Sequence, residues 1–225
     1  MGIENCGAGK GGVLCQTSLV QHQKVNVSPP IPAPRRRKAH LVAHQEIPRD
    51  HLTASEVKLL IEVVKNHGGW YSYRNSILIL MLYRHGLRRS EASRLRWSDV
   101  DLEEGTIYIR RIKGSRSGRH PLQGDEMRAL KKLKRDYFPS PFVFTSNRHT
   151  PLSERTISHI VHQAGNLAGF DFTVHAHLLR HACGYYLANK GVDTRTIQDY
   201  LGHANIQNTV RYTQLSAARF EGLWD

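Results

Sequence analysis

The sequence HLLRHACGYYLANKGVDTRTIQDYLGHANIQNTVRYT, residues 177–213, spaces ionisable side chains at fixed intervals. His177 and Arg180 are one helical turn apart, so a helix places the imidazole beside the guanidinium. His203 follows a glycine that interrupts the next helical stretch, and Tyr212 comes nine residues later. Cleavage of a phosphodiester by a side chain requires such groups, namely cations around the phosphate oxygens and a nucleophile.

Tyr212 taken alone has three interpretations. A tyrosine can fill the core, stack on a base or act as a nucleophile, and core packing is the commonest of the three. Tyr200 is a rival nucleophile, but Ile197 and Leu201 accompany it at helical spacing and predict that it is packed. The choice for Tyr212 therefore depends on the charged residues elsewhere in the chain.

Two further groups of cations precede this stretch. Arg88 follows Gly86 at the end of an apolar helix, so its guanidinium can turn inward. Glu91 lies three residues later on the same helical face and can orient Arg88. Lys113 opens the turn of a predicted hairpin, where its ammonium can reach into a DNA groove. These positions favour a site that binds phosphate.

The sequence gives little support to a metal or another cofactor. The histidines of HAHLLRH, residues 175–181, lack the neighbouring aspartate that a histidine metal site usually recruits, and HExxH is absent from the sequence. GAGKGG at 7–12 resembles a phosphate loop, but no strand precedes it and no Ser or Thr follows its lysine. We therefore expect no cofactor, and we expect arginines, which bind phosphate oxygens bidentately, to do the work of a metal.

Charge points to a polyanionic partner. The chain has 32 Lys and Arg against 19 Asp and Glu, a formal net charge of +13, spread along its length. Nucleic acid is the favoured partner because the sequence contains no lipidation signal and no lipid-binding amphipathic helix. The cations predicted to contact DNA lie in an N-terminal run and in the hairpin: Arg35, Arg36, Arg37, Lys38, Arg110, Arg111, Arg116 and Arg119.

The same totals predict an intracellular protein that does not cross a membrane. The longest apolar run between Ser76 and Arg84 holds seven residues, far short of the roughly 18 that a span needs. The three cysteines have no paired spacing, and the N-terminus lacks the pattern of a secretory signal. We expect a cytoplasmic location.

The chain divides into an arm and one folded domain. Residues 1–47 are rich in Gly, Ser, Gln and Pro, include PPIPAP at 29–34 and read as a disordered basic arm. Residues 48–225 form the folded domain, and their pattern is mainly helical. A capping box begins at Thr53, and an apolar helix is predicted from about Ser72 to His85. Further helices are expected at 89–96, 125–136, 153–169 and from His177 onward. A hairpin is predicted over 106–122 and a short strand at 142–144, so the fold class is mainly α with a small antiparallel sheet.

The order of these motifs resembles the tyrosine recombinases, also called the phage integrase family. The resemblance rests on GLRRSE, a lysine in a hairpin, HLLRH, LGH and a tyrosine nine residues later, and it extends from about Leu52 to Leu215. It implies the catalytic-domain fold of that family. It also implies that Arg88 and Arg180 clamp the scissile phosphate, that Lys113 protonates the departing 5′ oxygen, and that Glu91 has a supporting role.

The resemblance assigns the remaining groups as well. His177 assists as general acid or base, His203 hydrogen-bonds the phosphate, and Tyr212 attacks to give a 3′-phosphotyrosyl link and a free 5′ hydroxyl. The reaction exchanges one phosphoester for another and needs neither ATP nor a metal. Two duplexes cut one strand at a time imply four protomers on DNA, and an apolar C-terminal tail that includes Leu215, Phe220, Leu223 and Trp224 docks on a neighbour.

Within the family, the sequence resembles the short fimbrial phase-variation invertases, in the stretch LANKGVDTRTIQDYLGH at 187–203 and in its ending AARFEGLWD. This implies double-stranded DNA with inverted repeats as substrate, accessory DNA-bending proteins, and association with a bacterial nucleoid. Larger members carry a separate N-terminal helical domain, which residues 1–47 do not resemble. The alternatives are a mobile-element integrase or excision enzyme, a DNA-binding regulator without activity, a metal-dependent nuclease and a topoisomerase with the same tyrosine chemistry.

Overall fold

The computed structural model of the protein describes residues 50–112, 114–136, 139–214 and 224. All of them belong to one compact unit, Glu46–Asp225. The predictions for the arm at 1–47, for Lys113 and for tail residues Leu215, Phe220 and Leu223 lie outside the described residues. Within those ranges, no helix combines the length and apolarity needed to cross a bilayer.

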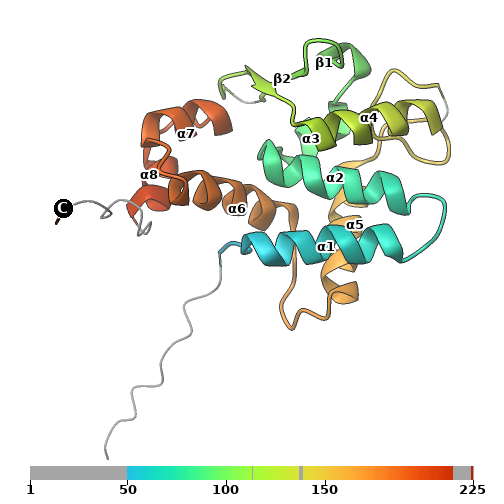
Figure 1. Cartoon of the computed structure of the whole chain (residues 1–225), viewed down its shortest axis with the longest axis horizontal. Helices are drawn as coiled ribbons and strands as arrows, with labels where there is room; N and C mark the ends of the chain where they lie inside the picture. Colours follow the sequence, from blue (N-terminus) through green and yellow to red (C-terminus); the bar gives the residue numbers. More distant parts are fainter. Residues whose placement is uncertain (1–49, 113, 137–138, 215–223, 225) are drawn as a thin grey trace, which may run out of the picture. The chain divides into compact units, whose positions relative to one another are not determined.

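The described chain is mostly helical with one three-stranded antiparallel sheet, which confirms the predicted fold class (Figure 1). The strands are ordered β1-β2-β3. The elements are α1 Ala54–Asn66, α2 Ser72–Arg84, α3 Arg89–Arg94, the 3₁₀ helix η1 Trp97–Asp99, β1 Val100–Asp101, β2 Thr106–Ile109, β3 Gly118–Pro121, α4 Gly124–Asp136, α5 Glu154–Leu167, α6 Ala176–Asn189, α7 Thr194–Leu201 and α8 Gln207–Gln214.

Local signals fix the first two helices. Thr53 and Glu56 form the predicted capping box at the start of α1, with the Glu56 backbone N–H donating to Thr53 Oγ1 at 3.3 Å and the Thr53 N–H donating to Glu56 Oε2 at 2.8 Å. Helix α2 follows and packs on α1 (Figure 1). Its apolar residues are buried on several faces, including Leu78, Ile79 and Met81, so α2 occupies the centre of the core.

The sheet differs from the prediction in two places. The hairpin of β2 and β3 is present and pairs Ile107 with His120. Strand β1 was not predicted, because two residues are too few to show an alternating pattern. The strand predicted at 142–144 is wrong, since Phe142 makes only an isolated bridge to Arg96. Pro141, which lacks a backbone N–H, precedes it and limits further pairing.

Helices α6, α7 and α8 enclose a second, smaller apolar cluster that contains Tyr212. Helix α7 ends at Gly202, whose φ of 68° is in the left-handed region that glycine tolerates best. The turn brings His203 back toward α8, where Thr209 is fully buried. This cluster therefore holds His203 and Tyr212 together.

Candidate active site

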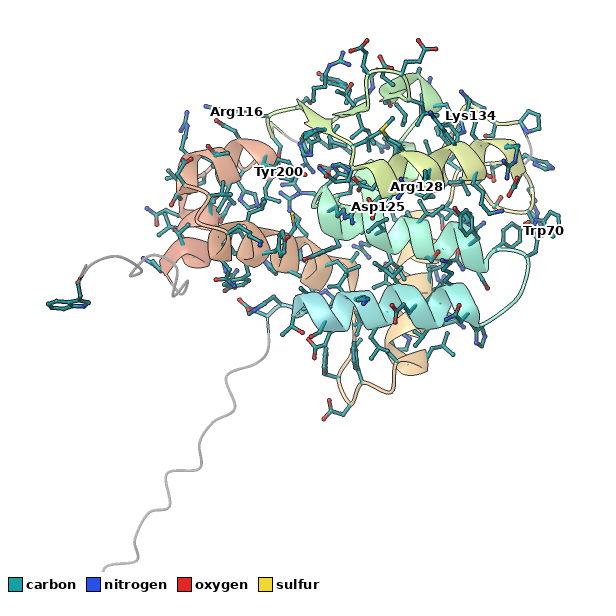
Figure 2. The ribbon with its side chains drawn as sticks, in the orientation of Figure 1. Trp70, Arg116, Asp125, Arg128, Lys134 and Tyr200 are labelled. Carbon is teal, nitrogen blue, oxygen red and sulfur yellow. The ribbon has the colours of Figure 1, made fainter. Side chains whose placement is uncertain are left out.

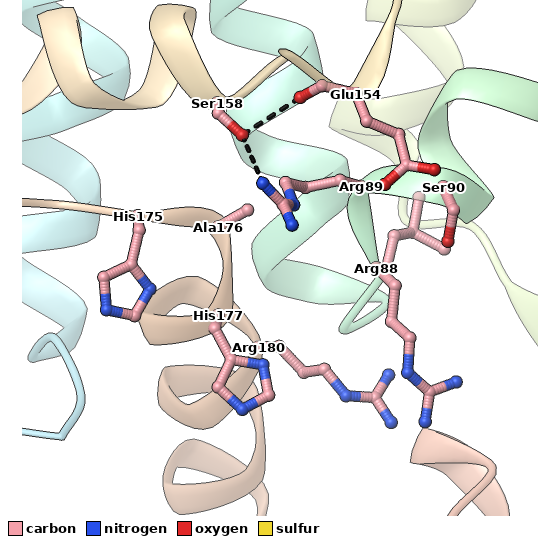
Figure 3. A pocket seen from close by; sticks show the side chains of 10 residues that line it. Arg88, Arg89, Ser90, Glu154, Ser158, His175, Ala176, His177 and Arg180 are labelled. Atoms are coloured by element: carbon pink, nitrogen blue, oxygen red, sulfur yellow. Dashed lines mark hydrogen bonds between the residues drawn. The ribbon is translucent and has the colours of Figure 1, made fainter.

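A pocket of about 420 Å³ lies where the link before α3, helix α5 and the start of α6 meet. The guanidinium groups of Arg88 and Arg180 lie near each other at one side of it, and His177 lies beside Arg180 (Figure 3). On another wall, Arg89 donates to Ser158 Oγ at 2.7 Å. The structure thus brings together three of the predicted catalytic residues from sequence positions about 90 residues apart.

Arg88 is held in place by Glu91, as the sequence predicted. The Nη1 atom of Arg88 is 2.9 Å from Glu91 Oε1, and its backbone N–H donates to Glu91 Oε2 at 2.8 Å. The same Nη1 donates to Ser115 Oγ in the hairpin loop at 3.1 Å. Burial by itself would raise the pKa of Glu91, but the charge of Arg111 and the backbone N–H of Arg88 outweigh it and lower that pKa. Glu91 is therefore a carboxylate at neutral pH.

Arg111 was predicted to contact DNA, and the structure contradicts this. Its side chain is 1% exposed and pairs with Glu91, with Nη1 2.6 Å from Oε2. It also donates to the carbonyl oxygens of His85 at 3.1 Å, Gly86 at 3.2 Å and Tyr200 at 2.8 Å. With Nη1 and Nη2 both engaged inside the protein, Arg111 joins the hairpin to α3 and α7 instead of facing solvent.

Arg180 is also buried, with 1% of its surface exposed. It donates to the carbonyl oxygens of Gly86 and, at 2.7 Å, Leu201. Burial, followed by the positive charges of Arg111 and Arg88, lowers the pKa of Arg180 to about 9, so it stays charged at neutral pH. The guanidinium groups of Arg88, Arg111 and Arg180 thus surround the single carboxylate of Glu91. Binding of an anion in the pocket would reduce the repulsion between these cations.

His203 faces the same cations from the turn after α7. Burial and then Arg180 lower its pKa to about 3, so it is neutral at pH 7. Its Nδ1 atom is 2.8 Å from Thr209 Oγ1, and its backbone carbonyl accepts from Gln198 Nε2 at 3.0 Å. With Nδ1 engaged, the other ring nitrogen is the one available to a ligand.

Tyr212 lies behind this group of cations and is 1% exposed. Its hydroxyl is 2.7 Å from His181 Nδ1. Its ring packs edge-on to Tyr185 at 5.0 Å and lies roughly parallel to His203 at 6.2 Å. Burial raises the pKa of Tyr212 to about 12, although Arg180 opposes the shift. The residues that line the pocket do not include Tyr212, whose hydroxyl instead contacts His181, one helical turn along α6 from the pocket residue His177.

Tyr200 lies in a different environment from Tyr212. Its hydroxyl donates to the Arg84 carbonyl at 2.9 Å, and its ring stacks on His120 with centroids 3.9 Å apart. Burial raises its pKa. Tyr200 therefore packs between α7, α2 and the hairpin, as its helical neighbours predicted.

The other cations of the hairpin remain candidates for DNA contacts. Arg110 pairs with Asp99 at 2.7 Å and Arg116 with Asp199 at 3.0 Å, while Arg119 donates to Thr106 Oγ1 at 3.2 Å. Arg116 projects from the hairpin toward α7 (Figure 2). All three side chains are exposed. Their roles in DNA binding stay predictions.

Comparison with known proteins identifies the family of this chain. The phage integrase family profile matches residues 50–219. The chain belongs to the phage integrase family. Two curated relatives are the type 1 fimbriae regulatory proteins FimB and FimE of Escherichia coli (strain K12), 46% and 45% identical. Each alignment covers 79% of this chain and at least 90% of the relative.

Solved structures place this integrase-family chain among the tyrosine recombinases. The crystal structure of XerA recombinase is 30% identical with a TM-score of 0.65. The pre-cleavage complex of XerH recombinase with its difH substrate is 26% identical, also with a TM-score of 0.65. The chain spans 61% and 55% of the length of these two proteins, so the match concerns their catalytic part.

Sequence reasoning missed one contact in this recombinase fold. His181, which contacts the Tyr212 hydroxyl, was considered only as part of a metal motif. Among the described residues, no three His, Cys, Asp or Glu side chains are grouped to hold a metal ion. The spacing in the sequence could have indicated this contact, because His181 follows His177 by four residues and so lies on the same face of α6.

Proposed function

We propose that the protein is a site-specific DNA recombinase in which Tyr212 breaks a DNA strand and holds its end as a 3′-phosphotyrosyl link. The observation that carries this proposal is the meeting of Arg88, Arg180 and His177 at one pocket, with the Tyr212 hydroxyl held by His181 one helical turn along α6 from His177. Planar guanidinium groups can form two parallel hydrogen bonds with the non-bridging oxygens of a phosphodiester. The excess of buried positive charge also favours binding of this negatively charged group.

The residue roles follow from the chemistry. A phenol is a poor nucleophile at neutral pH unless nearby cations stabilise it as it attacks. Arg88 and Arg180 supply that charge, and His203 hydrogen-bonds the phosphate. Lys113 in the hairpin loop protonates the departing 5′ oxygen, and His177 assists proton transfer. In this mechanism, DNA docking brings the scissile phosphate and the Tyr212 hydroxyl together.

We propose inversion of a segment between inverted repeats as the biological outcome. The similarity to the fimbriae regulatory proteins FimB and FimE supports it. The alternatives, integration and excision of a mobile element, use the same chemistry on sites arranged differently. Short repeats found on either side of a promoter near the gene support inversion, and attachment-like direct repeats support the alternative.

We also propose that four protomers assemble on two duplexes at the bacterial nucleoid, with accessory DNA-bending proteins as partners. Residues 48–225 act as the catalytic domain, and the basic run at 35–38 adds contacts to phosphate. The C-terminal tail docks on a neighbouring protomer. Exposure of the Trp224 side chain, at 96%, supports this docking, because a large apolar ring is costly to leave in water.

Covalent capture tests the proposed reaction without knowledge of the DNA site. The full chain is incubated in EDTA with sheared genomic DNA from its source, and the protein–DNA adducts that survive denaturation are sequenced. The best-captured site is then rebuilt as a nicked suicide duplex. We expect an adduct with the wild-type protein and none with Tyr212→Phe. Cleavage that needs added metal and persists in Tyr212→Phe contradicts the proposal.

A further inference from the structure

His181 has no part in the roles described so far, yet it is the residue that contacts the nucleophile. Its Nδ1 atom is 2.7 Å from the Tyr212 hydroxyl, and its side chain is largely buried between α6 and α8. We propose that His181 is a catalytic residue, which accepts the hydroxyl proton of Tyr212 as the tyrosine attacks DNA. This inference rests on the proposed recombinase function.

Burial and the charges around His181 keep its ring neutral. On α6 it neighbours His177, whose ring is edge-on to it with centroids 4.2 Å apart, and Arg180; Arg211 approaches from α8 and Asp50 from the segment before α1. Burial and then His177 and Arg211 lower the pKa of His181 to about 4, against an opposing effect of Asp50. The ring is neutral at pH 7. In the tautomer that carries its hydrogen on Nε2, Nδ1 has a lone pair and the Tyr212 O–H donates to it, and the proposed step uses this tautomer.

The two other histidines of the site are placed differently relative to Tyr212. His203 lies against the face of the tyrosine ring and has its Nδ1 engaged by Thr209. His177 opens onto the phosphate pocket and meets the edge of His181. Only a group at the hydroxyl itself can take the proton directly, and His181 occupies that position within the described residues.

The proposed step is balanced in atoms and charge. As the bond from Tyr212 Oη to phosphorus forms, the phenol proton moves to His181 Nδ1. The bond from phosphorus to the 5′ oxygen breaks, and that oxygen takes a proton from Lys113. In rejoining, the incoming 5′ hydroxyl returns its proton to Lys113 and His181 returns its proton to Tyr212. Both residues then recover their starting state, so neither a metal nor a co-reactant is consumed.

The test compares three proteins on the captured suicide duplex, with pH as the variable. His181→Asn keeps a hydrogen-bonding group near the Nδ1 position but removes its basicity. His67→Asn, an exposed histidine just after α1, is the matched control. Gel shift and thermal unfolding establish that each variant binds DNA and folds. Single-turnover rates of adduct formation are then measured from about pH 6 to pH 9, and each variant is expressed as its ratio to the wild type.

We expect His181→Asn to react about 10²-fold more slowly at pH 7 and to recover about tenfold per pH unit relative to wild type, since its phenol must ionise into solvent first. A 3,5-difluorotyrosine at position 212, whose phenol is a stronger acid, should restore most of the loss. A slower variant with an unchanged pH dependence overturns the proton-transfer role, and an equal or faster rate overturns it too.

If the wild type forms no adduct, both the recombinase function and this inference fail. If the wild type forms adducts but His181→Asn lacks the expected slow, pH-dependent rate, only the inference fails.

Discussion

The ring of Tyr212 lies directly against the Cα atom of Gly184. A Cβ atom added to Gly184 would be 2.6 Å from Tyr212 Cε2, 2.7 Å from Cδ2 and 2.8 Å from Cζ, all closer than real Cβ contacts. Gly184 lies inside α6, where glycine is otherwise unfavourable by about 1 kcal/mol relative to alanine. The absence of a side chain at Gly184 therefore allows Tyr212 of α8 to pack close against α6.

Gly184→Ala should displace the nucleophile without removing it. The methyl group pushes the Tyr212 ring away from α6, and a misplacement of about 1 Å costs roughly 10²-fold in rate. We expect slow adduct formation with nearly unchanged affinity in a gel shift. Gly124→Ala is the matched control, because the nearest atom to its new Cβ is the flexible end of Arg128 at 3.5 Å. Wild-type cleavage by Gly184→Ala would mean that the ring position does not limit the reaction.

Arg111→Met should destabilise the fold far more than Arg116→Met. Arg111 and Glu91 are both 1% exposed, and loss of one partner of a buried ion pair costs about 3–5 kcal/mol. Arg116 and Asp199 form an exposed pair, which contributes about 1 kcal/mol at most. Urea unfolding measures both free energies. Similar values for the two variants would show that the buried pair contributes no more than a surface one.

Arg111 also marks where prediction from sequence fails. The capping box at Thr53, the Arg88–Glu91 contact and the hairpin are determined by residues a few positions apart, so the sequence predicts them. The environment of Arg111 depends on the Tyr200 carbonyl, 89 residues away. A cation in a hairpin next to other exposed arginines looks like a DNA contact until the packing of α7 on that hairpin is known.

In the candidate site, too, some features depend on residues close together in the sequence and others depend on how the helices pack. The order and spacing of Arg88, Arg180, His203 and Tyr212 make them candidates in the sequence, since these residues belong to recognisable motifs. The contact between His181 and Tyr212 depends on how α6 packs against α8, and helix periodicity alone does not determine which residues of two helices meet. The sequence therefore indicates the groups proposed to bind phosphate, but it does not indicate the residue that contacts the proposed nucleophile.

Acid should destabilise the protein well above the pKa of its carboxylates. Burial is the main cause that lowers the pKa of His120, to about 3, and His85 and Arg111 add to it. Between about pH 6.5 and 3 the unfolded chain binds a proton that the folded chain does not, so the free energy of unfolding falls as pH falls. Each such histidine changes the free energy of unfolding by up to about 1.4 kcal/mol per pH unit. His181 and His203, whose pKa values are also lowered by burial, should contribute in the same direction.

Urea unfolding at about pH 6.5 and pH 5 measures this slope above the range where carboxylates titrate. His120→Asn should reduce the slope by about 1 kcal/mol per pH unit, because one of the buried neutral rings is gone. The exposed His67→Asn should leave the slope as it is. An unchanged slope in His120→Asn contradicts the assignment of a neutral, buried imidazole at this position.

Thr209→Val should separate the orientation of His203 from the stability of α8. Thr209 is fully buried, and its hydroxyl is the group that meets His203 Nδ1 at 2.8 Å. Valine keeps the branched shape but removes the hydrogen bond, so the imidazole loses the partner that orients its ring while the helix keeps its packing. We expect about 1 kcal/mol less stability and about a tenfold slower adduct formation. A loss of stability without any loss of rate would mean that His203 does not need this partner to reach the phosphate.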